Sequence, residues 1–202
     1  MKVSMESIQM KMVVIGDSSV GKTNIIHRYC DNRFDGNTIP TIAIDFINRE
    51  VLLYGRLIKV QFWDTAGQEK YRSISKNYYK MSNIIVVVFD VTNQKSFENL
   101  GGWLEDVKTF GADNTHVYIV GNKIDRIEER VISNEEAKEF CNQRKLPYFE
   151  VSAALDNKGL IHETIDEIIK LQLTDIDKQK LSGLVTGQPI REVHHHRRGW
   201  CC

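Results

Sequence analysis

Eight residues near the N-terminus, Gly16 to Thr23, fit the pattern G-x-x-x-x-G-K-[ST]. They follow the apolar run Ile8 to Ile15, which predicts a strand, and they precede an amphipathic stretch that predicts a helix. In such a loop the backbone N–H groups converge on phosphate oxygens, while the helix N-terminus and the lysine add positive charge. The hydroxyl of the last residue can ligate Mg²⁺. We therefore expect this loop to bind a ligand that carries phosphate groups, with contacts from Ser18, Ser19, Val20, Gly21, Lys22, Thr23 and Asn24.

Short β-rich runs alternate with longer amphipathic stretches along the rest of the chain. The strands predicted are 8–15, 42–53, 57–63, 84–89, 117–120 and 148–151, and the helices follow Gly21 and lie near 95–110, 134–144 and 160–173. The second and third strands meet at Tyr54-Gly55-Arg56, a turn that favours an antiparallel hairpin. We predict an α/β fold: a doubly wound, mostly parallel six-stranded sheet with one antiparallel edge strand and helices on both faces. The divisions expected are a flexible N-terminus at 1–7, one domain at 8–173 and a flexible tail at 174–202.

Composition excludes several classes of protein. Lys and Arg together number 27, as do Asp and Glu, so no global field favours nucleic acid, and no nucleic-acid partner is expected. The longest strongly apolar run, Ile84 to Phe89, is too short to span a membrane, and the N-terminus does not resemble a secretion signal. We therefore expect the chain to stay in the cytosol. Cys30 and Cys141 stand alone and Cys201-Cys202 end the chain, which is neither a disulfide framework nor a zinc-ligand spacing.

A second motif, Asp64-Thr65-Ala66-Gly67-Gln68, lies at the end of the hairpin's second predicted strand. Ligands of open α/β sheets bind at this carboxyl edge. Asp64 is placed to hold the shell of a Mg²⁺ ion, and the N–H of Gly67 can approach a terminal phosphate. The amide of Gln68 both donates and accepts hydrogen bonds, so it can orient an attacking water.

A third motif, Asn122-Lys123-Ile124-Asp125, also follows a predicted strand. The carboxylate of Asp125 only accepts hydrogen bonds, so it matches guanine, which presents two adjacent donors, and not adenine. Lys123 is expected to lie along the base, and Asn122 to tie this loop to the first motif. After the last strand, backbone N–H groups of Ser152, Ala153 and Ala154 can face the guanine carbonyl.

With these motifs in order, the chain resembles the Rab family of the Ras-like small GTPases from about Ile8 to Leu173 and again at its C-terminus. Four further segments share the resemblance: 42–46 (IAIDF), 59–63 (KVQFW), 70–74 (KYRSI) and 78–80 (YYK). The resemblance implies that Thr41 completes the Mg²⁺ shell when the γ-phosphate is present and that Phe34 packs against guanine. It also implies that Phe46, Trp63 and Tyr78 form the surface that effectors recognise, although large rings on strands are also ordinary packing residues.

Two departures from the family pattern lie in the expected site. Ser19 stands where many Rabs have glycine, and its side chain crowds the phosphate loop, which bears on the intrinsic hydrolysis rate. Ala154 stands where many have lysine, which removes packing near the base and bears on nucleotide affinity. Neither change removes a group that contacts the ligand.

The C-terminal pair Cys201-Cys202 is similar to the double-cysteine ending of Rabs, which carries a geranylgeranyl group on each cysteine. Two lipid chains hold a protein on a membrane, whereas one gives only marginal attachment. His194 to Arg198 can add weak attraction to anionic lipid. The resemblance therefore implies a lipid-anchored protein on the cytoplasmic face of an intracellular membrane that cycles with the cytosol.

The function expected is a switch in vesicle trafficking that binds GTP or GDP with Mg²⁺ and hydrolyses GTP slowly. It is expected to be a monomer that recruits effectors in the GTP state. Further partners implied are an exchange factor, a GTPase-activating protein, and the prenylation and GDP-dissociation-inhibitor machinery. Two alternatives stay open: a P-loop phosphotransferase such as a small kinase, which gives Asn122 to Asp125 no purpose, and a GTP-binding module that never hydrolyses, which gives Gln68 none.

Overall fold

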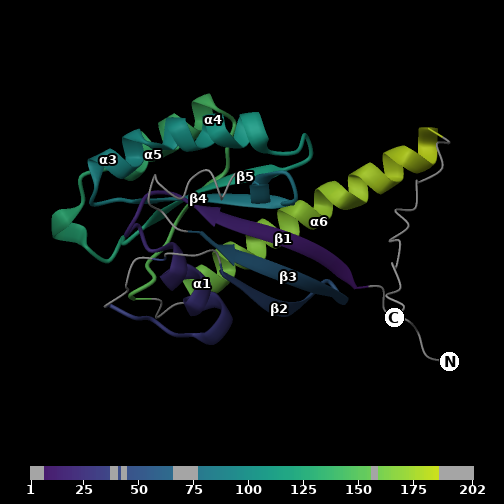
Figure 1. Ribbon diagram of the computed structural model, residues 1–202, viewed down its shortest axis with the longest axis horizontal. Helices are drawn as coiled ribbons and strands as arrows, with labels where there is room; N and C mark the ends of the chain where they lie inside the picture. The colour runs from purple at the N-terminus through teal and green to yellow at the C-terminus, as the bar shows by residue number, and fades with distance from the viewer. Residues whose placement is uncertain (1–6, 37–40, 42–44, 66–76, 156–158, 187–202) are drawn as a thin grey trace, which may run out of the picture.

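The computed structural model describes residues 7–36, 41, 45–65, 77–155 and 159–186, the last nine of these by their backbone only. The strands are β1 (Ile8–Ile15), β2 (Asp45–Leu53), β3 (Arg56–Asp64), β4 (Ile84–Asp90), β5 (His116–Asn122) and β6 (Tyr148–Glu150). The helices are α1 (Lys22–Asp31), α3 (Gln94–Glu98), α4 (Leu100–Phe110), α5 (Asn134–Gln143) and α6 (Leu160–Thr186), with a 3₁₀ turn at Ile127–Glu129. Figure 1 shows their arrangement.

The six strands form one sheet in the order β2-β3-β1-β4-β5-β6. Every pairing is parallel except that of β2 with β3, which is antiparallel and places β2 at an edge. This confirms the fold class predicted from the sequence. Because the other five strands run in one direction, their carboxyl ends meet at one edge of the sheet, where ligands bind in folds of this kind.

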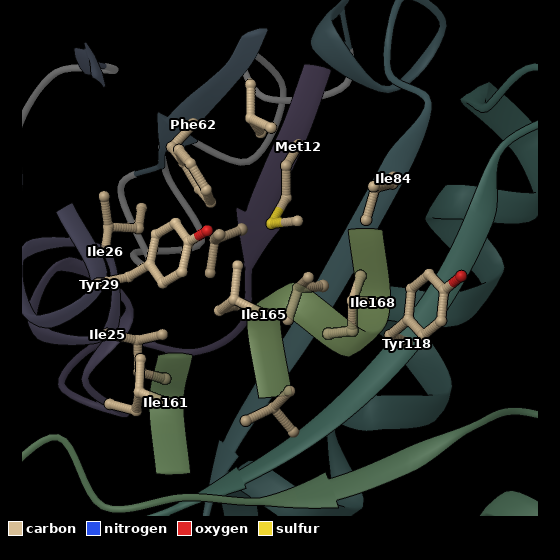
Figure 2. Close-up of a cluster of buried hydrophobic side chains, with 14 of the residues drawn as sticks. Met12, Ile25, Ile26, Tyr29, Phe62, Ile84, Tyr118, Ile161, Ile165 and Ile168 are labelled. Carbon is tan, nitrogen blue, oxygen red and sulfur yellow. The ribbon is translucent and has the colours of Figure 1, made fainter. Parts of the chain in front are cut away.

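Helices cover both faces of the sheet, as Figure 1 shows with α3, α4 and α5 on one side and α1 on the other. Side chains of β1 alternate between the two cores: Met10, Met12 and Val14 join a cluster with α1 and α6, whereas Val13 and Ile15 join one with α3, α4 and α5. Figure 2 shows the first cluster, where side chains from α1, the central strands and α6 meet. Burial on both sides explains why β4 is apolar at nearly every position.

The predicted hairpin turn between β2 and β3 consists of Tyr54 and Gly55. Both have positive φ angles, 50° and 70°, and Leu53 pairs with Arg56 across the turn. Two such residues match the twist of the flanking strands, which is why two-residue hairpin loops favour this conformation.

The helix predicted near 95–110 is interrupted at Asn99, which separates α3 from α4. Asn93 caps α3 by accepting a hydrogen bond from the backbone N–H of Ser96 at 3.2 Å. The Asn99 side chain donates to Asp17, 82 positions away, at 2.6 Å. Asparagine is a poor residue for a helix interior, and here its side chain is committed to a distant loop.

The last helix differs from the prediction, which ended it near Leu173. Instead α6 continues to Thr186, so the expected tail at 174–202 begins inside a helix. Contacts with the sheet accompany the extra turns: Ile176 packs against the core, and Asp177 forms an ion pair with Arg56 at 2.8 Å. Residues 1–6 and 187–202 lie outside the described part of the chain. In the part described, no helix combines the length and the apolar character that crossing a bilayer requires.

Candidate functional site

Two cavities share a wall at the carboxyl edge of the sheet. The larger, of about 330 Å³, lies beside the loop after β5, and the smaller, of about 30 Å³, lies within the loop between β1 and α1. Ser19, Gly21 and Asn24 line both of them. The other residues of the larger cavity are Phe34, Gly36, Asn122, Lys123, Asp125, Arg126, Ala153 and Ala154, and those of the smaller are Ser18, Lys22, Thr23 and Thr41.

The loop between β1 and α1 requires its two glycines. Gly16 has a φ of 136°, and a Cβ atom there would lie 2.1 Å from the carbonyl oxygen of Val88. Gly21 has a φ of 99°, and its Cβ would lie 2.2 Å from Nδ2 of Asn122. Ser19 also has a positive φ of 64°, a conformation that glycine adopts without the Cβ penalty. The departure noted at Ser19 therefore falls on a position whose backbone favours glycine.

Lys22 is the first residue of α1 and its side chain is almost wholly buried, with 5% of the residue exposed. Its Nζ atom donates to the carbonyl oxygens of Gly16 at 3.0 Å and Asp17 at 2.7 Å. Burial lowers the pKa of Lys22 to about 8, although Asp64 and Asp17 act in the opposite direction. An ammonium group held this way at a helix N-terminus is suited to receive an anion.

Three oxygen-bearing side chains meet beside the smaller cavity. Oγ1 of Thr23 donates to Oδ2 of Asp64 at 2.6 Å and lies 3.1 Å from Oγ1 of Thr41. Thr41 also donates to the same carboxylate oxygen at 3.4 Å. Burial raises the pKa of Asp64, and its Oδ1 atom is buried without a hydrogen-bond partner among the described residues. Hydroxyl and carboxylate oxygens are ligands that Mg²⁺ accepts together with water and phosphate, so the residues present fit this ion.

Asn122 connects the loops on both sides of the larger cavity. Its Nδ2 atom donates to the carbonyl oxygen of Val20 at 2.8 Å, and its Oδ1 atom accepts from the backbone N–H of Ala153 at 3.1 Å. The side chain therefore joins the β1–α1 loop to the loop after β6. The N–H of Ala153, which we expected to face the guanine carbonyl, donates to Asn122 in this structure.

The other two polar residues of the third motif are also held by partners. Oδ1 of Asp125 accepts a hydrogen bond from the Ser152 hydroxyl at 2.5 Å. Nζ of Lys123 forms an ion pair of 2.6 Å with Asp90, whose side chain is 8% exposed. These contacts fix the directions of two charged groups that line the larger cavity.

One wall of the larger cavity depends on Arg28. Its Nε atom donates to the carbonyl oxygen of Ala153 at 3.0 Å, and its Nη2 atom donates to that of Ala154 at 3.4 Å. The guanidinium also lies 5.8 Å from the centre of the Phe34 ring, which is 42% exposed. Arg28 thus places an aromatic ring opposite the loop after β6.

Sequence reasoning missed several residues that shape the site. Arg126 and Gly36 line the larger cavity, and Arg28 and Asp90 support residues that do. Asp17 supports Lys22 of the smaller cavity. Asp17 occupies an unspecified position of the first motif, so the motif itself carries no signal for it. Four predicted residues, Gly67, Gln68, Cys201 and Cys202, lie outside the described part of the chain.

The three aromatic residues predicted to be an effector surface lie side by side. The ring centres of Phe46 and Trp63 are 5.0 Å apart, and those of Trp63 and Tyr78 are 4.7 Å apart. Phe46 is 46% exposed, and Trp63 and Tyr78 are half-buried against the core beneath α3 and α4. The cluster therefore has both an exposed part and a packed part.

Comparison with known proteins places this arrangement in a family. The model of the Ras family matches residues 11–174. "Ras-related protein Rab-1A" of Dictyostelium discoideum is 41% identical over 187 residues, which cover 93% of this chain and 88% of that protein. "Ras-related protein Rab-3" of Caenorhabditis elegans is 35% identical over 192 residues, which cover 90% of this chain and 88% of that protein.

Proposed function

This chain belongs to the Rab family of the Ras-like small GTPases, and from that membership we propose that the two joined cavities are the GTP and GDP site of its switch. It is a GTP-binding, GTP-hydrolysing protein of vesicle transport, and neither the phosphotransferase nor the non-hydrolysing alternative is favoured. The observation that carries the assignment is the meeting of three separate loops around a cavity of about 330 Å³, which shares a wall with a smaller cavity lined by the β1–α1 loop.

The guanine base occupies the larger cavity in this proposal. Asp125 accepts from the two adjacent donors of guanine, with its carboxylate aimed by Ser152. Lys123 and Phe34 flank the base, and Asn122, Ser152, Ala153 and Ala154 complete the wall. A buried acceptor that adenine leaves unpaired disfavours adenine strongly, by about 10⁴-fold in sites built for such discrimination.

The phosphates occupy the smaller cavity. Two donors of the Lys22 ammonium bind loop carbonyls and its third can bind phosphate oxygens, and the N–H groups of Ser18 to Asn24 supply further donors. Thr23, Thr41 and Asp64 would hold Mg²⁺, which when bound offsets the negative charge of the β- and γ-phosphates. The Oδ1 atom of Asp64, which has no hydrogen-bond partner among the described residues, and the close approach of the two hydroxyls support this role.

Hydrolysis requires a group that orients water, and we assign it to Gln68, with Gly67 contacting the γ-phosphate. The intrinsic rate is low because an arginine or another polarising group from an activating protein supplies much of the stabilisation in such reactions, about 10³ to 10⁵ in rate. Loss of the γ-phosphate releases the segments that carry Thr41 and Gly67, which is how the two states differ for a partner.

Partners and location complete the proposal. Effectors contact Phe46, Trp63 and Tyr78 in the GTP state, and the exposed face of this cluster supports that role. Cys201 and Cys202 carry lipids that hold the monomer on the cytoplasmic face of an intracellular membrane. An exchange factor, a GTPase-activating protein, and the prenylation and GDP-dissociation-inhibitor machinery act on it in turn.

A competition titration tests the nucleotide site. Unlabelled guanine and adenine nucleotides would compete with a fluorescent guanine nucleotide on the purified protein, with and without Mg²⁺. Guanine nucleotides should compete at far lower concentrations, and Mg²⁺ should strengthen their binding. Equal competition by the two purines would refute the proposal.

A separate test addresses Gln68. The variant Gln68→Leu should bind guanine nucleotides as the wild type does but lose stimulated hydrolysis, measured as phosphate release in a single turnover. Gln143→Leu, on the exposed end of α5, is the matched control and should hydrolyse normally. Unchanged stimulated hydrolysis in Gln68→Leu would remove that residue from the mechanism.

A further inference from the structure

The carboxylate of Asp17 points away from the smaller cavity and toward helix α4. Its Oδ2 atom accepts from Nδ2 of Asn99 at 2.6 Å, and its Oδ1 atom accepts from the indole N–H of Trp103 at 2.8 Å. Asn99 lies 82 positions away in the sequence, at the break between α3 and α4, and Trp103 lies 86 positions away, one turn into α4. Both carboxylate oxygens are therefore used outside the loop.

The backbone of the same residue acts in the opposite direction. The carbonyl oxygen of Asp17 accepts a hydrogen bond of 2.7 Å from the ammonium of Lys22, the charged group that lies in the smaller cavity. One residue thus connects the lysine to a helix on the other side of the β1–α1 loop. Charge-assisted hydrogen bonds are shorter and stronger than neutral ones, so the bond from Lys22 to the carbonyl oxygen of Asp17 is a strong one.

The chemistry of the loop explains why the carboxylate needs two donors. A negative charge directed at the smaller cavity would repel phosphate groups. In agreement with this, α1 has no acidic residue in its first turn, beside that cavity. Trp103 is buried, with 3% of the residue exposed, and a buried indole N–H requires an acceptor. The pairing directs the charge away from the ligand and satisfies the indole at the same time.

We infer that Asp17 is a positioning residue for the phosphate loop, held by Asn99 and Trp103 so that the loop backbone keeps Lys22 in place for a nucleoside diphosphate or triphosphate. This inference rests on the proposed nucleotide site and adds to it a role for α4, none of whose side chains line either cavity. Disturbing the contact should weaken the grip on the β-phosphate and leave the recognition of guanine intact, because Asp125 is supported by Ser152 from another loop.

Two variants remove one donor each. Trp103→Phe deletes the indole N–H, and Asn99→Ala deletes the side-chain amide at a position whose backbone is already helical. Each loses a hydrogen bond to a charged acceptor, so GDP should dissociate about tenfold faster from each. The preference for GDP over GMP should fall by a similar factor, while the preference for guanine over adenine stays unchanged. Asp17→Ala should make the Trp103→Phe change nearly silent in a double-mutant cycle.

Val107→Ala is the matched control because Val107 is buried in the same helix and core but its apolar side chain cannot form a hydrogen bond with Asp17. It should lower the unfolding midpoint of the nucleotide-free protein and leave GDP release within about twofold of the wild type. Asn99→Ala should differ from this control by releasing GDP about tenfold faster.

The inference is overturned if Asn99→Ala and Trp103→Phe retain GDP as long as the wild type does. It is also overturned if they weaken GMP and GDP equally, because the contact would then serve general stability. Failure of the wild type itself to bind guanine nucleotides would be a separate result, which refutes the proposed function and this inference with it.

Discussion

Oγ1 of Thr23 donates a hydrogen bond of 2.6 Å to Oδ2 of Asp64, a residue 41 positions away in the sequence. The contact joins the start of α1 to the end of β3. The other oxygen of this carboxylate, Oδ1, is buried without a hydrogen-bond partner among the residues described. An oxygen in this condition is costly unless a hydrogen bond or a cation compensates for it, which supports the proposed Mg²⁺ site.

Asp64→Asn should therefore weaken the effect of Mg²⁺ on nucleotide retention. An amide supplies a weaker oxygen ligand than a carboxylate and carries no charge to offset that of the ion. We expect GDP to leave the variant about tenfold faster than the wild type in Mg²⁺, and chelation by EDTA to accelerate its release much less. Stopped-flow fluorescence of a labelled GDP measures both rates.

Asp45→Asn is the control for this prediction. Asp45 pairs with Asp64 in the register of β2 and β3 but is exposed, and its side chain accepts a hydrogen bond from the backbone N–H of Phe46. It should respond to EDTA as the wild type does. If Asp64→Asn also keeps the full response, Asp64 does not hold the ion.

Ser152→Ala should reduce affinity for guanine nucleotides. The hydroxyl of Ser152 donates to Oδ1 of Asp125 at 2.5 Å, and hydrogen bonds to charged groups contribute about 1.5–3 kcal/mol. We expect binding of GDP about tenfold weaker in isothermal titration. Adenine nucleotides should be unaffected because they gain nothing from Asp125.

A second serine separates this effect from general stability. Ser133 caps α5 by accepting from the N–H of Glu136 at 3.0 Å and does not line the nucleotide cavities. Ser133→Ala should cost about 1 kcal/mol of stability without changing GDP affinity. Equal affinity losses in the two variants would show that Asp125 does not depend on Ser152.

The sheet was predictable from the sequence because its signals are local. Apolar runs such as Ile84 to Phe89 mark strands buried on both faces, and Tyr54-Gly55 marks a turn. The end of α6 was not predictable, because a polar stretch after Leu173 has no helical periodicity of its own. Its contact with the sheet joins Arg56 to Asp177, 121 positions apart, which no local pattern reveals.

The difference between local signals and contacts made only by the fold also applies to the site. The motif that contains Lys22 and Thr23 includes most of the residues that line the smaller cavity, because its spacing reflects a fixed backbone geometry, whereas Thr41 was expected only from the family resemblance. Asp17, Arg28 and Asp90 were missed because each acts through a partner brought near only by the fold. Spacing therefore identifies the groups that face the ligand better than those that hold them.

Glu150 should make stability depend on pH. Burial alone would raise its pKa, but hydrogen bonds from Arg130 and Tyr148 outweigh this, and the pKa lies below the usual value of 4.5. Such a carboxylate contributes stability that is complete above the unfolded-state pKa and is lost as the pH falls through the folded-state pKa. Glu150→Gln should therefore lower the free energy of unfolding by about 1–2 kcal/mol at pH 7.

Urea denaturation at several pH values measures this difference. The gap between wild type and Glu150→Gln should be constant from pH 7 to about 5 and should shrink below about 4.5, where the wild type loses the contribution. Glu139→Gln, on the exposed face of α5, should show almost no gap at any pH. A gap in Glu150→Gln that persists unchanged at low pH would mean that the loss is one of packing.

Asp177→Asn should loosen the outer turns of α6. The ion pair with Arg56 has contacts of 3.0 and 2.8 Å, but its side chains are 34% and 48% exposed, so its contribution is modest. We expect backbone amides of 174–186 to exchange with solvent about two- to fivefold faster, while those of 160–173 keep their protection.

Glu167→Gln is the control: it removes an exposed acid from the inner part of the same helix and should leave the outer turns unchanged. GDP affinity should be equal in all three proteins, because the contact lies at the opposite end of the strands from the nucleotide. Unaltered exchange in Asp177→Asn would mean that the packing of Ile176 alone extends the helix past Leu173.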